Sequence, residues 1–227
     1  MNIYYVFDID GTITVPRKPM DTDFFEKFYS FAKKNKVVLV TGSDKKLALE
    51  QIPEKLLSLV KLYTCSGAEG LDNIEADCDI NDPELIKELE TLLDLYDYKD
   101  KTGNHINQRI GMINFSVVGR NANDQQRKEY SEFDKIHKQR QQIVDRLKKY
   151  DNYDICIGGE ISIDITKKGI NKSLVAKDIL ASDPDAQLIF YGNQILDGND
   201  YFLAKHIQEN KLGYSILTDY EILRKYL

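Results

Sequence analysis

Residues 3–12 read IYYVFDIDGT, an apolar run that ends in two aspartates, a glycine and a threonine. A continuous apolar run of this length, followed at once by a turn, is typical of a buried strand in a parallel sheet. Parallel sheets of α/β proteins bind ligands beyond the carboxyl ends of their strands. The stretch therefore predicts an α/β fold whose functional site begins directly after the first strand.

The first third of the chain continues this βα pattern. Apolar residues recur at helical spacing over residues 24–32, and residues 37–40 form a second apolar run that ends at Thr41-Gly42-Ser43-Asp44. Residues 62–65 supply a third run, so consecutive parallel strands with right-handed crossovers are expected. Two more runs restore the same rhythm near the C-terminus: residues 188–191 and 214–217.

The middle of the chain has a different pattern. Asp82-Pro83 predicts a helix start, and residues 161–166 alternate isoleucine with polar residues, which is typical of a strand with one buried face. Three further segments are expected between them: a solvated loop over residues 98–107, an apolar β-rich run over 110–118 and one long polar helix over about 125–150. This mixture favours an antiparallel α+β insert.

Together the two patterns predict two domains. We expect a Rossmann-like core with a parallel sheet over residues 1–80 and 169–227. We expect an inserted α+β cap with an antiparallel sheet over residues 81–168. A chain of 227 residues is long enough to bury a core in each.

The composition excludes several classes of protein. With 42% hydrophobic and 30% charged residues, the chain has the balance of a folded globular protein. Its net charge of −6 offers no basic field to nucleic acid. Its three cysteines form no CxxC pair, so we expect a reducing cytoplasm, with neither a disulfide framework nor a zinc site. No signal peptide and no apolar stretch of roughly 20 residues is evident, so no membrane partner is expected.

Asp8 and Asp10 lie two residues apart where the first strand opens into a loop. One carboxylate can attack a phosphorus atom while the other transfers the proton of the entering or leaving oxygen. Because these groups and a phosphate are all negative, such a site also needs a hard cation, and oxygen ligands suit Mg²⁺. An isolated pair of this kind is more often a plain acidic turn, but the strand before it and Gly11-Thr12 after it favour chemistry.

DxDGT after an N-terminal strand resembles the first motif of the haloacid-dehalogenase-like superfamily. The resemblance implies that Asp8 is the phosphorylated nucleophile and Asp10 the general acid and base. Thr41 or Ser43 matches the second motif, a hydroxyl that holds phosphate, although a plain helix cap would explain that stretch alone. Lys172 matches the third motif, a lysine that neutralises the phosphoryl group, although a solvated helix lysine is the alternative.

The fourth motif of the superfamily, an acidic or amide cluster after a strand, resembles Tyr191-Gly192-Asn193 with Gly198-Asn199-Asp200. The resemblance implies that Asn193 and Asp200 join Asp8 and Asp10 around Mg²⁺. Many members carry aspartate where this chain has Asn193, but an amide oxygen can also bind Mg²⁺.

The insert resembles the cap of eukaryotic-type phosphomannomutases over residues 108–120, 124–127 and 158–164, and Val15-Pro16-Arg17 resembles an early arginine of that family. The resemblance implies that seven residues hold the distal phosphate and the sugar: Arg17, Arg109, Asn114, Arg120, Arg127, Ser162 and Asp164. For any single arginine a surface ion pair is the commoner explanation. The chain departs from the family at Ile110, in a shortened segment over 69–79, and after Asp200, where the family's extra ion-binding loop has no clear copy.

The resemblance implies a phosphomannomutase that interconverts mannose 1-phosphate and mannose 6-phosphate, or glucose phosphates, through an aspartyl phosphate. It also implies Mg²⁺ and a hexose 1,6-bisphosphate activator as cofactors, a homodimer formed through the cap, and a place in GDP-mannose biosynthesis. Two alternatives stay open: a sugar-phosphate phosphatase of the same superfamily and a catalytically weak sugar-phosphate-binding protein. The cap arginines argue against the first, and the retained nucleophile argues against the second.

Overall fold

The structure is a computed structural model that describes residues 2–196 and 198–227. The chain divides into two compact units. Unit 1 comprises Met1–Ala76 and Ile170–Leu227, and unit 2 comprises Asp77–Gly169. The boundaries expected from the sequence, after residues 80 and 168, differ from these by a few residues.

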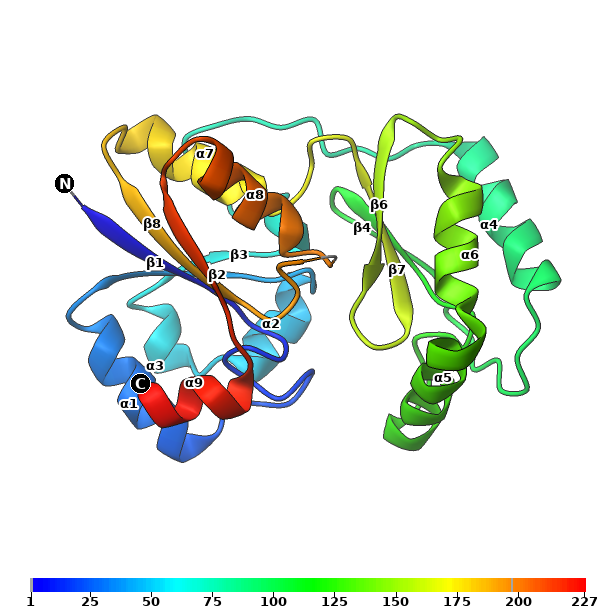
Figure 1. The fold of residues 1–227 in the computed structure, drawn as a ribbon, viewed down its shortest axis with the longest axis horizontal. Helices are drawn as coiled ribbons and strands as arrows, with labels where there is room; N and C mark the ends of the chain where they lie inside the picture. The colour runs from blue at the N-terminus through cyan, green and yellow to red at the C-terminus, as the bar shows by residue number, and fades with distance from the viewer. Residues whose placement is uncertain (1, 197) are drawn as a thin grey trace. The chain divides into compact units, whose positions relative to one another are not determined.

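Unit 1 is built on a five-stranded parallel sheet in the order β3-β2-β1-β8-β9 (Figure 1). The strands are β1 (Ile3–Asp8), β2 (Lys36–Val40), β3 (Lys61–Tyr63), β8 (Gln187–Gly192) and β9 (Gly213–Leu217). β1 pairs with β2 on one side and β8 on the other, and its second half, Val6 to Asp8, is buried. The parallel sheet predicted from the apolar runs is confirmed.

Helices cover both faces of this sheet (Figure 1). One face carries α1 (Thr22–Ala32), α2 (Lys45–Gln51), α3 (Glu54–Leu57) and α9 (Tyr220–Tyr226), and the other carries α7 (Ser173–Ser182) and α8 (Tyr201–Glu209). On the first face the ring of Phe7 meets Phe28 of α1 edge to face, with ring centroids 5.0 Å apart. Because β1 is buried on both faces, the residues at its end are held in a fixed place.

Unit 2 contains a four-stranded antiparallel sheet in the order β4-β5-β7-β6. Its strands are β4 (Ile106–Arg109), β5 (Met112–Phe115), β6 (Tyr153–Gly158) and β7 (Ser162–Lys167), and its helices are α4 (Pro83–Leu95), α5 (Asp124–His137) and α6 (Gln139–Leu147). The helices pack on one face of the sheet, around buried Phe115, Tyr130 and Ile163 (Figure 1). The separate antiparallel sheet predicted for the insert is confirmed.

The single helix expected over residues 125–150 is wrong, because α5 ends at His137 and α6 begins at Gln139. Lys138 between them adopts the left-handed conformation, with φ at 54°. The carboxylate of Asp134 accepts hydrogen bonds from the backbone N and the Nε of Arg140 across the break, at 2.7 and 2.8 Å. A pattern of polar residues does not reveal such a buried pair.

Two other expectations for the insert are also corrected. The segment 98–107 is not a solvated loop throughout, because Tyr98 is buried against Tyr130 and β4 begins at Ile106. The apolar run over 110–118 is not one strand, because Gly111, at a φ of 69°, turns the chain from β4 into β5.

The strand expected over 161–166 has both of its faces buried rather than one. Its polar residues Ser162 and Asp164 are buried as its isoleucines are, and their side chains accept hydrogen bonds from Arg120 and Asn114. Among the residues that the structure describes, no helix is both long enough and apolar enough to cross a bilayer.

Candidate active site

Three strand ends meet at one edge of the sheet in unit 1. Asp8 ends β1, Thr41 directly follows β2, and Asn193 directly follows β8. From β1 the chain builds β2 and β3 to one side, whereas β8 and β9 lie on the other. Such a reversal of strand order leaves a crevice beyond the carboxyl ends, and ligands of open α/β sheets bind there. The residues between strands β1 and β8 are therefore placed at a binding position.

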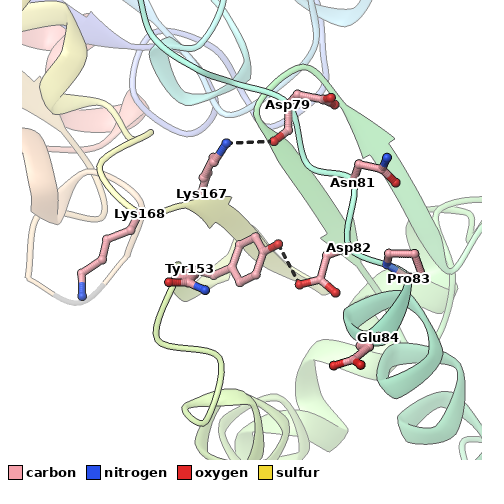
Figure 2. Close-up of a pocket in the computed structure, with 9 residues that line it drawn as sticks. Asp79, Asn81, Asp82, Pro83, Glu84, Tyr153, Lys167 and Lys168 are labelled. Carbon is pink, nitrogen blue, oxygen red and sulfur yellow. Dashed lines mark hydrogen bonds between the residues drawn. The ribbon is translucent and has the colours of Figure 1, made fainter.

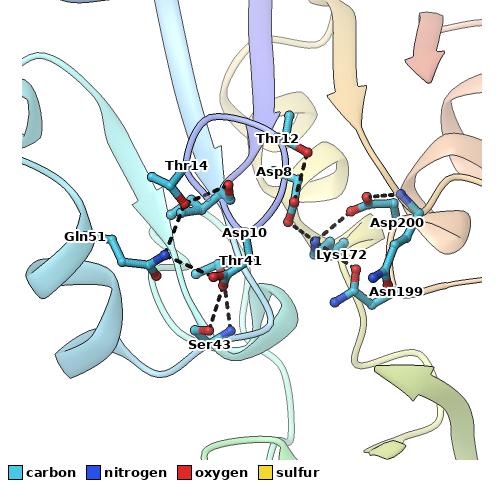
Figure 3. Close-up of polar contacts among 12 residues, drawn as sticks. Asp8, Asp10, Thr12, Thr14, Thr41, Ser43, Gln51, Lys172, Asn199 and Asp200 are labelled. Atoms are coloured by element: carbon cyan, nitrogen blue, oxygen red, sulfur yellow. Dashed lines mark hydrogen bonds and ion pairs between the residues drawn. The ribbon is translucent and has the colours of Figure 1, made fainter. Parts of the chain in front are cut away.

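Asp8, Lys172 and Asp200 form a buried charged cluster at this edge (Figure 3). Lys172 Nζ donates hydrogen bonds to Asp8 Oδ1 and Asp200 Oδ1, each at 2.6 Å, and to Asn199 Oδ1 at 3.1 Å. Lys172 is the N-cap residue of α7 and is fully buried, so it is not the solvated helix lysine that its position alone would favour. Thr12 Oγ1 donates to the second oxygen of Asp8 at 3.1 Å.

The cluster shifts the ionisation of its members. The pKa of Asp8 is raised to about 7: burial raises it most, Lys172 lowers it, and the carboxylates of Asp200 and Asp10 raise it. Burial by itself lowers the pKa of Lys172, but the carboxylates of Asp200 and Asp8 raise it above its ordinary value. Lys172 therefore stays an ammonium ion at neutral pH, whereas full ionisation of Asp8 calls for more positive charge nearby.

The carboxylate of Asp10 is oriented by four hydrogen-bond donors (Figure 3). Its Oδ1 accepts from the backbone N of Arg17 at 2.7 Å and from Gln51 Nε2 at 3.0 Å. Its Oδ2 accepts from Ser43 Oγ at 3.0 Å and from Thr41 Oγ1 at 3.4 Å. Both hydroxyls predicted to hold phosphate therefore lie beside the predicted acid and base, and Arg17 reaches this carboxylate through its backbone.

Two of these contacts were not foreseen from the sequence. Gln51 is 1% exposed at the end of α2 and also donates to Thr14 Oγ1 at 3.1 Å, so it joins the loop after β1 to this helix. The one feature of the sequence that points to Gln51 is its position on the same face of α2 as the buried Ala48. Thr12 follows Gly11 in the DxDGT motif, but nothing in the pattern shows that its hydroxyl bonds Asp8.

In unit 2, Asn114 and Asp164 face one another across β5 and β7, and Asn114 Nδ2 donates to Asp164 Oδ1 at 2.5 Å. Gly158 of the neighbouring strand makes room for this carboxylate, because a Cβ there would lie 2.3 Å from Asp164 Oδ2. Arg120 Nη1 donates to Ser162 Oγ at 3.2 Å, two residues before Asp164. Four of the predicted sugar and phosphate contacts are thus grouped around β7.

Two more predicted arginines lie at other points of unit 2. Arg127 of α5 pairs with Glu160, which lies between β6 and β7, with Nε and Oε2 3.2 Å apart. Arg109 lies at the end of β4, where the amide oxygen of Asn107 can accept from its Nε and Nη2 at 3.2 Å. Arg140, which the sequence did not single out, donates from Nη1 to the backbone oxygen of Gly159 at 3.1 Å.

Comparison with known proteins assigns this combination of sites to a family. Residues 23–226 match the model of the eukaryotic phosphomannomutase family. The chain belongs to the eukaryotic phosphomannomutases. It is 30% identical over 224 residues to the phosphomannomutase of Encephalitozoon cuniculi, covering 89% of this chain and 84% of that protein. It is 31% identical to the phosphomannomutase of Drosophila melanogaster, with 88% and 85% covered. The family resemblance inferred from the motifs is confirmed.

Solved structures support the fold of this phosphomannomutase family member. The IMP-nucleotidase of Plasmodium falciparum aligns with a TM-score of 0.61 at 12% identity, covering 99% of this chain and 66% of that one. The C-terminal domain of the Candida albicans trehalose-6-phosphate phosphatase aligns with a TM-score of 0.59 at 16% identity, covering 92% and 75%. At these identities the likeness concerns the fold alone, and it agrees with the predicted α/β architecture.

The donors at the sheet edge fit the Mg²⁺ that the phosphomannomutase family implies. Asp8 and Asp10 offer oxygen atoms, and burial together with the carboxylates of Asp200 and Asp10 raises the pKa of Asp8, so a cation beside it would favour the ionised form. The side chain of Asn193 lies against Gly11, where a Cβ would meet its Nδ2 at 2.2 Å. Among the described residues, His, Cys, Asp and Glu side chains nowhere gather in threes as metal ligands, and Mg²⁺ can take further oxygens from amides, water or phosphate.

Asp200 is already engaged within this site. Its Oδ1 accepts from Lys172, and its Oδ2 accepts from the backbone N of Gln194 at 3.0 Å. Asp8 and Asp10 also accept hydrogen bonds at both oxygens, and a carboxylate oxygen can accept a hydrogen bond and bind a cation at once, so these bonds do not exclude Asp200 as a ligand. They show that Asp200 holds Lys172 in this structure.

A hollow of about 650 Å³ lies elsewhere in unit 2, at the N-terminus of α4 (Figure 2). It is lined by Asp79, Asn81, Asp82, Pro83, Glu84, Asn152, Tyr153, Lys167 and Lys168. Its polar groups bond to one another, as Tyr153 does through its hydroxyl to Asp82 Oδ2 at 3.0 Å. None of the predicted site residues lines it, so we assign it no part in the chemistry.

Proposed function

We propose that the chain is a phosphomannomutase that moves a phosphoryl group between O1 and O6 of mannose phosphate through a phosphorylated Asp8. The observation that carries this proposal is the buried Asp8–Lys172–Asp200 cluster at the reversal of strand order, with Asp10 two residues further along. A binding protein has no need of a buried nucleophile whose charge is compensated by a lysine. Membership of the phosphomannomutase family supports the same reaction.

The proposed reaction has a priming transfer, followed by two transfers in each turnover. In the priming transfer an oxygen of Asp8 attacks the phosphorus of a hexose 1,6-bisphosphate, the bond between Asp8 and phosphorus forms, and the bond from phosphorus to the sugar oxygen breaks while Asp10 gives that oxygen a proton. The free hydroxyl of the substrate then attacks the phosphorus on Asp8 and gives its proton to Asp10, while the bond between phosphorus and the Asp8 oxygen breaks. A bisphosphate results, and it must reorient before it returns its other phosphoryl group to Asp8.

Several residues of unit 1 support these steps. Lys172 offsets the negative charge of Asp8 and of the phosphoryl group, and Asp200 holds Lys172 in place through a 2.6 Å bond. Thr41 and Ser43 are within bonding distance of Asp10, at 3.4 and 3.0 Å, so they can orient its carboxyl group. Both hydroxyls can also turn to a phosphate oxygen, which is the role that the second motif implies.

Asp8, Asp10 and Asn193 would hold the proposed Mg²⁺, with Asp200 as a further ligand. When bound, the ion supplies positive charge that offsets the negative charge of the carboxylates and the phosphoryl group. Asp8 is the residue of this chain that gains most from it, because its pKa is raised to about 7 by burial and by neighbouring carboxylates.

Unit 2 is proposed to bind the part of the substrate that does not react. Guanidinium groups suit a phosphate dianion, and the predicted arginines are Arg109, Arg120 and Arg127, with Arg17 from unit 1. Asn114, Ser162 and Asp164 carry the amide, hydroxyl and carboxylate that hydroxyl groups of a sugar need. We also propose a homodimer formed through unit 2, a cytoplasmic location and a role in GDP-mannose supply, which rest on the family resemblance.

The experiment that tests this function is an assay of mannose 1-phosphate with Mg²⁺ and a trace of glucose 1,6-bisphosphate. Mannose 6-phosphate and free phosphate are followed in the same tube, with Asp8→Asn as the control. Isomer formation with little release of phosphate, lost in Asp8→Asn, is the expected result. Free phosphate as the main product would instead identify a phosphatase, and no product with any hexose phosphate would leave a binding protein.

A further inference from the structure

Arg127 already holds a carboxylate in this structure. Its Nε lies 3.2 Å from Glu160 Oε2, and the Arg127 side chain is 8% exposed against 41% for Glu160. The guanidinium group of Arg127 is thus buried, whereas the Glu160 side chain that pairs with it is partly exposed to solvent. A guanidinium group recognises carboxylates and phosphates by the same charge-assisted hydrogen bonds, so Glu160 occupies a position that a phosphate can also take.

Arg140, near the same turn, forms an ion pair with a buried partner and serves as a comparison. Arg140 bonds the buried carboxylate of Asp134 through both its backbone N and its Nε, and its Nη1 bonds the backbone oxygens of Gly159 and Ser162 at 3.1 and 3.4 Å. Each of these partners is either backbone or a buried side chain. Arg140 is therefore structural, whereas the carboxylate that pairs with Arg127 belongs to a side chain that is 41% exposed.

The turn that carries Glu160 allows its side chain to move. It follows Gly158 and Gly159, and Gly159 has a φ of 55° with no atom within 4 Å of a Cβ built on it. The carbonyl oxygen of Gly159 is held by Arg140 at 3.1 Å, so the movement is one of the Glu160 side chain, which is 41% exposed. On the other side Ile161 is fully buried, so β7 stays in place while Glu160 swings.

We infer that Glu160 is a specificity-determining residue that competes with the substrate's distal phosphate for Arg127. This inference rests on the proposed function, in which Arg127 binds that phosphate. A phosphate monoester carries nearly two negative charges at neutral pH, whereas a carboxylate carries one. Glu160 is therefore displaced by sugar phosphates but not by sugars whose only charge is a carboxylate, and the site selects the dianion.

The test compares Glu160→Gln with the wild-type protein in the presence of Mg²⁺. We expect KM for mannose 1-phosphate and the Kd for inorganic phosphate to fall about two- to five-fold, with kcat unchanged, since one ion pair of this exposure contributes little. Glu160→Asp, which keeps the charge on a shorter side chain, should lower both constants to a smaller extent. Glu129→Gln is the matched control. Glu129 lies on the same helix as Arg127, and its carboxylate pairs with Lys99 and not with an arginine.

The ¹⁵N–¹H resonance of Arg127 Nε, assigned with Arg127→Lys, reports the contact without any turnover. It should shift in Glu160→Gln and should shift further on titration with inorganic phosphate, at lower concentrations than in the wild type. Equal phosphate affinity in the two proteins, or a rise in KM, would overturn the competition while the isomerase assay still stands. A resonance that phosphate moves in neither protein would show that Arg127 is not a phosphate site, which contradicts its proposed role as well.

Discussion

Asp8 and Asp200 share one ammonium group, so the ionisation of the nucleophile depends on its neighbours as much as on pH. Lys172 lies 2.6 Å from an oxygen of each carboxylate and is fully buried with them. Two carboxylates and one ammonium group leave this buried cluster with a deficit of positive charge, in a region from which water is excluded. Asp8, the proposed nucleophile, therefore has a raised pKa, and a cation placed beside it would favour its ionised form.

The raised pKa of Asp8 makes the free energy of unfolding depend on pH, and this dependence can be measured. The pKa of Asp8 is about 7 in the folded state, against an ordinary value of 3.8. Between pH 3.8 and about pH 7 the folded state therefore binds a proton on Asp8 that the unfolded state has lost. The stabilisation that this proton gives to the folded state is lost as pH rises through about 7. Asp8→Asn cannot lose a proton, so its stability should gain about 2–3 kcal/mol relative to wild type between pH 5 and pH 8 without metal.

Urea unfolding in EDTA at pH 5, 6, 7 and 8 provides the free energies of unfolding for this comparison. Asp23→Asn, which removes an exposed carboxylate of α1, should run parallel to the wild type. If Asp8→Asn also ran parallel, Asp8 would already be ionised at pH 5 and the charge deficit described above would not exist.

At the scale of secondary structure, helix α7 holds more than the lysine at its start. Asp178 is fully buried within it and accepts hydrogen bonds from the Tyr63 hydroxyl and from the backbone N of Asn73, both at 2.7 Å, and of Ile74, at 3.0 Å. Burial alone raises the pKa of Asp178, but the bonds from Tyr63 and from the backbone lower it below its ordinary value. One carboxylate thus joins α7, β3 and the segment that leaves unit 1.

Asp178→Ala should free that segment. The change leaves a tyrosine hydroxyl and backbone N–H groups without their acceptor, so the free energy of unfolding should fall by about 2–5 kcal/mol at pH 7. Because the pKa is lowered in the folded state, this contribution is present at neutral pH and disappears as pH falls, and the two proteins should converge in acid. The amides of Asn73 and Ile74 should exchange hydrogen at least about ten-fold faster.

Lys177→Ala is the control for helix propensity, since it alters the exposed neighbour of Asp178 on the same helix. Unchanged exchange at residues 73 and 74 in Asp178→Ala would mean that other contacts hold the segment. The same result with a large loss of stability would assign the carboxylate to α7 and β3 alone.

The elements that the sequence predicted well are those with a local signal. Buried strands are continuous apolar runs, and the motif residues Asp8, Asp10, Thr41 and Lys172 adjoin strand ends or a helix start. Contacts between distant segments have no such signal. Gln51 reaches Asp10 over 41 positions, and the break at Lys138 is tied to an ion pair between Asp134 and Arg140 that only the fold creates.

Side-chain function was harder to foresee than side-chain position for the same physical reason. Arg127 and Arg140 are both arginines of the polar stretch after residue 124, and only the family resemblance separates them at the level of sequence. In the structure Arg127 pairs with an exposed glutamate, and Arg140 pairs with a buried aspartate and bonds backbone oxygens. This difference lies in the burial of the partner, and burial is a property of the folded chain.

For the molecule as a whole, the site residues divide between two units with different tasks. The proposed nucleophile, its lysine and the proposed acid and base belong to unit 1, whereas most of the predicted contacts to the distal phosphate and sugar belong to unit 2. A substrate that has no sugar and no phosphate apart from the reacting one should therefore need only the first set. This division can be tested, because p-nitrophenyl phosphate carries a single reactive phosphoryl group and no sugar.

Arg120→Met should separate the two tasks. The arginine donates to Ser162 in unit 2, and the loss of a charge-assisted bond to phosphate is expected to cost about 1.5–3 kcal/mol, or a fall of roughly 10- to 150-fold in kcat/KM for mannose 1-phosphate. Slow hydrolysis of p-nitrophenyl phosphate should stay within about two-fold of wild type, since it uses only Mg²⁺ and the unit 1 residues Asp8, Asp10 and Lys172. Asp8→Asn should abolish both reactions.

Arg146→Met is the matched control, because it removes an arginine of α6 that pairs with Glu88 on the surface of the same unit, and it should leave both reactions unchanged. Equal losses of both activities in Arg120→Met would mean that Arg120 supports the structure of the catalytic site. A loss confined to p-nitrophenyl phosphate would reverse the assignment of tasks to the two units. Only a selective loss with the sugar phosphate agrees with an arginine that grips the phosphate that does not react.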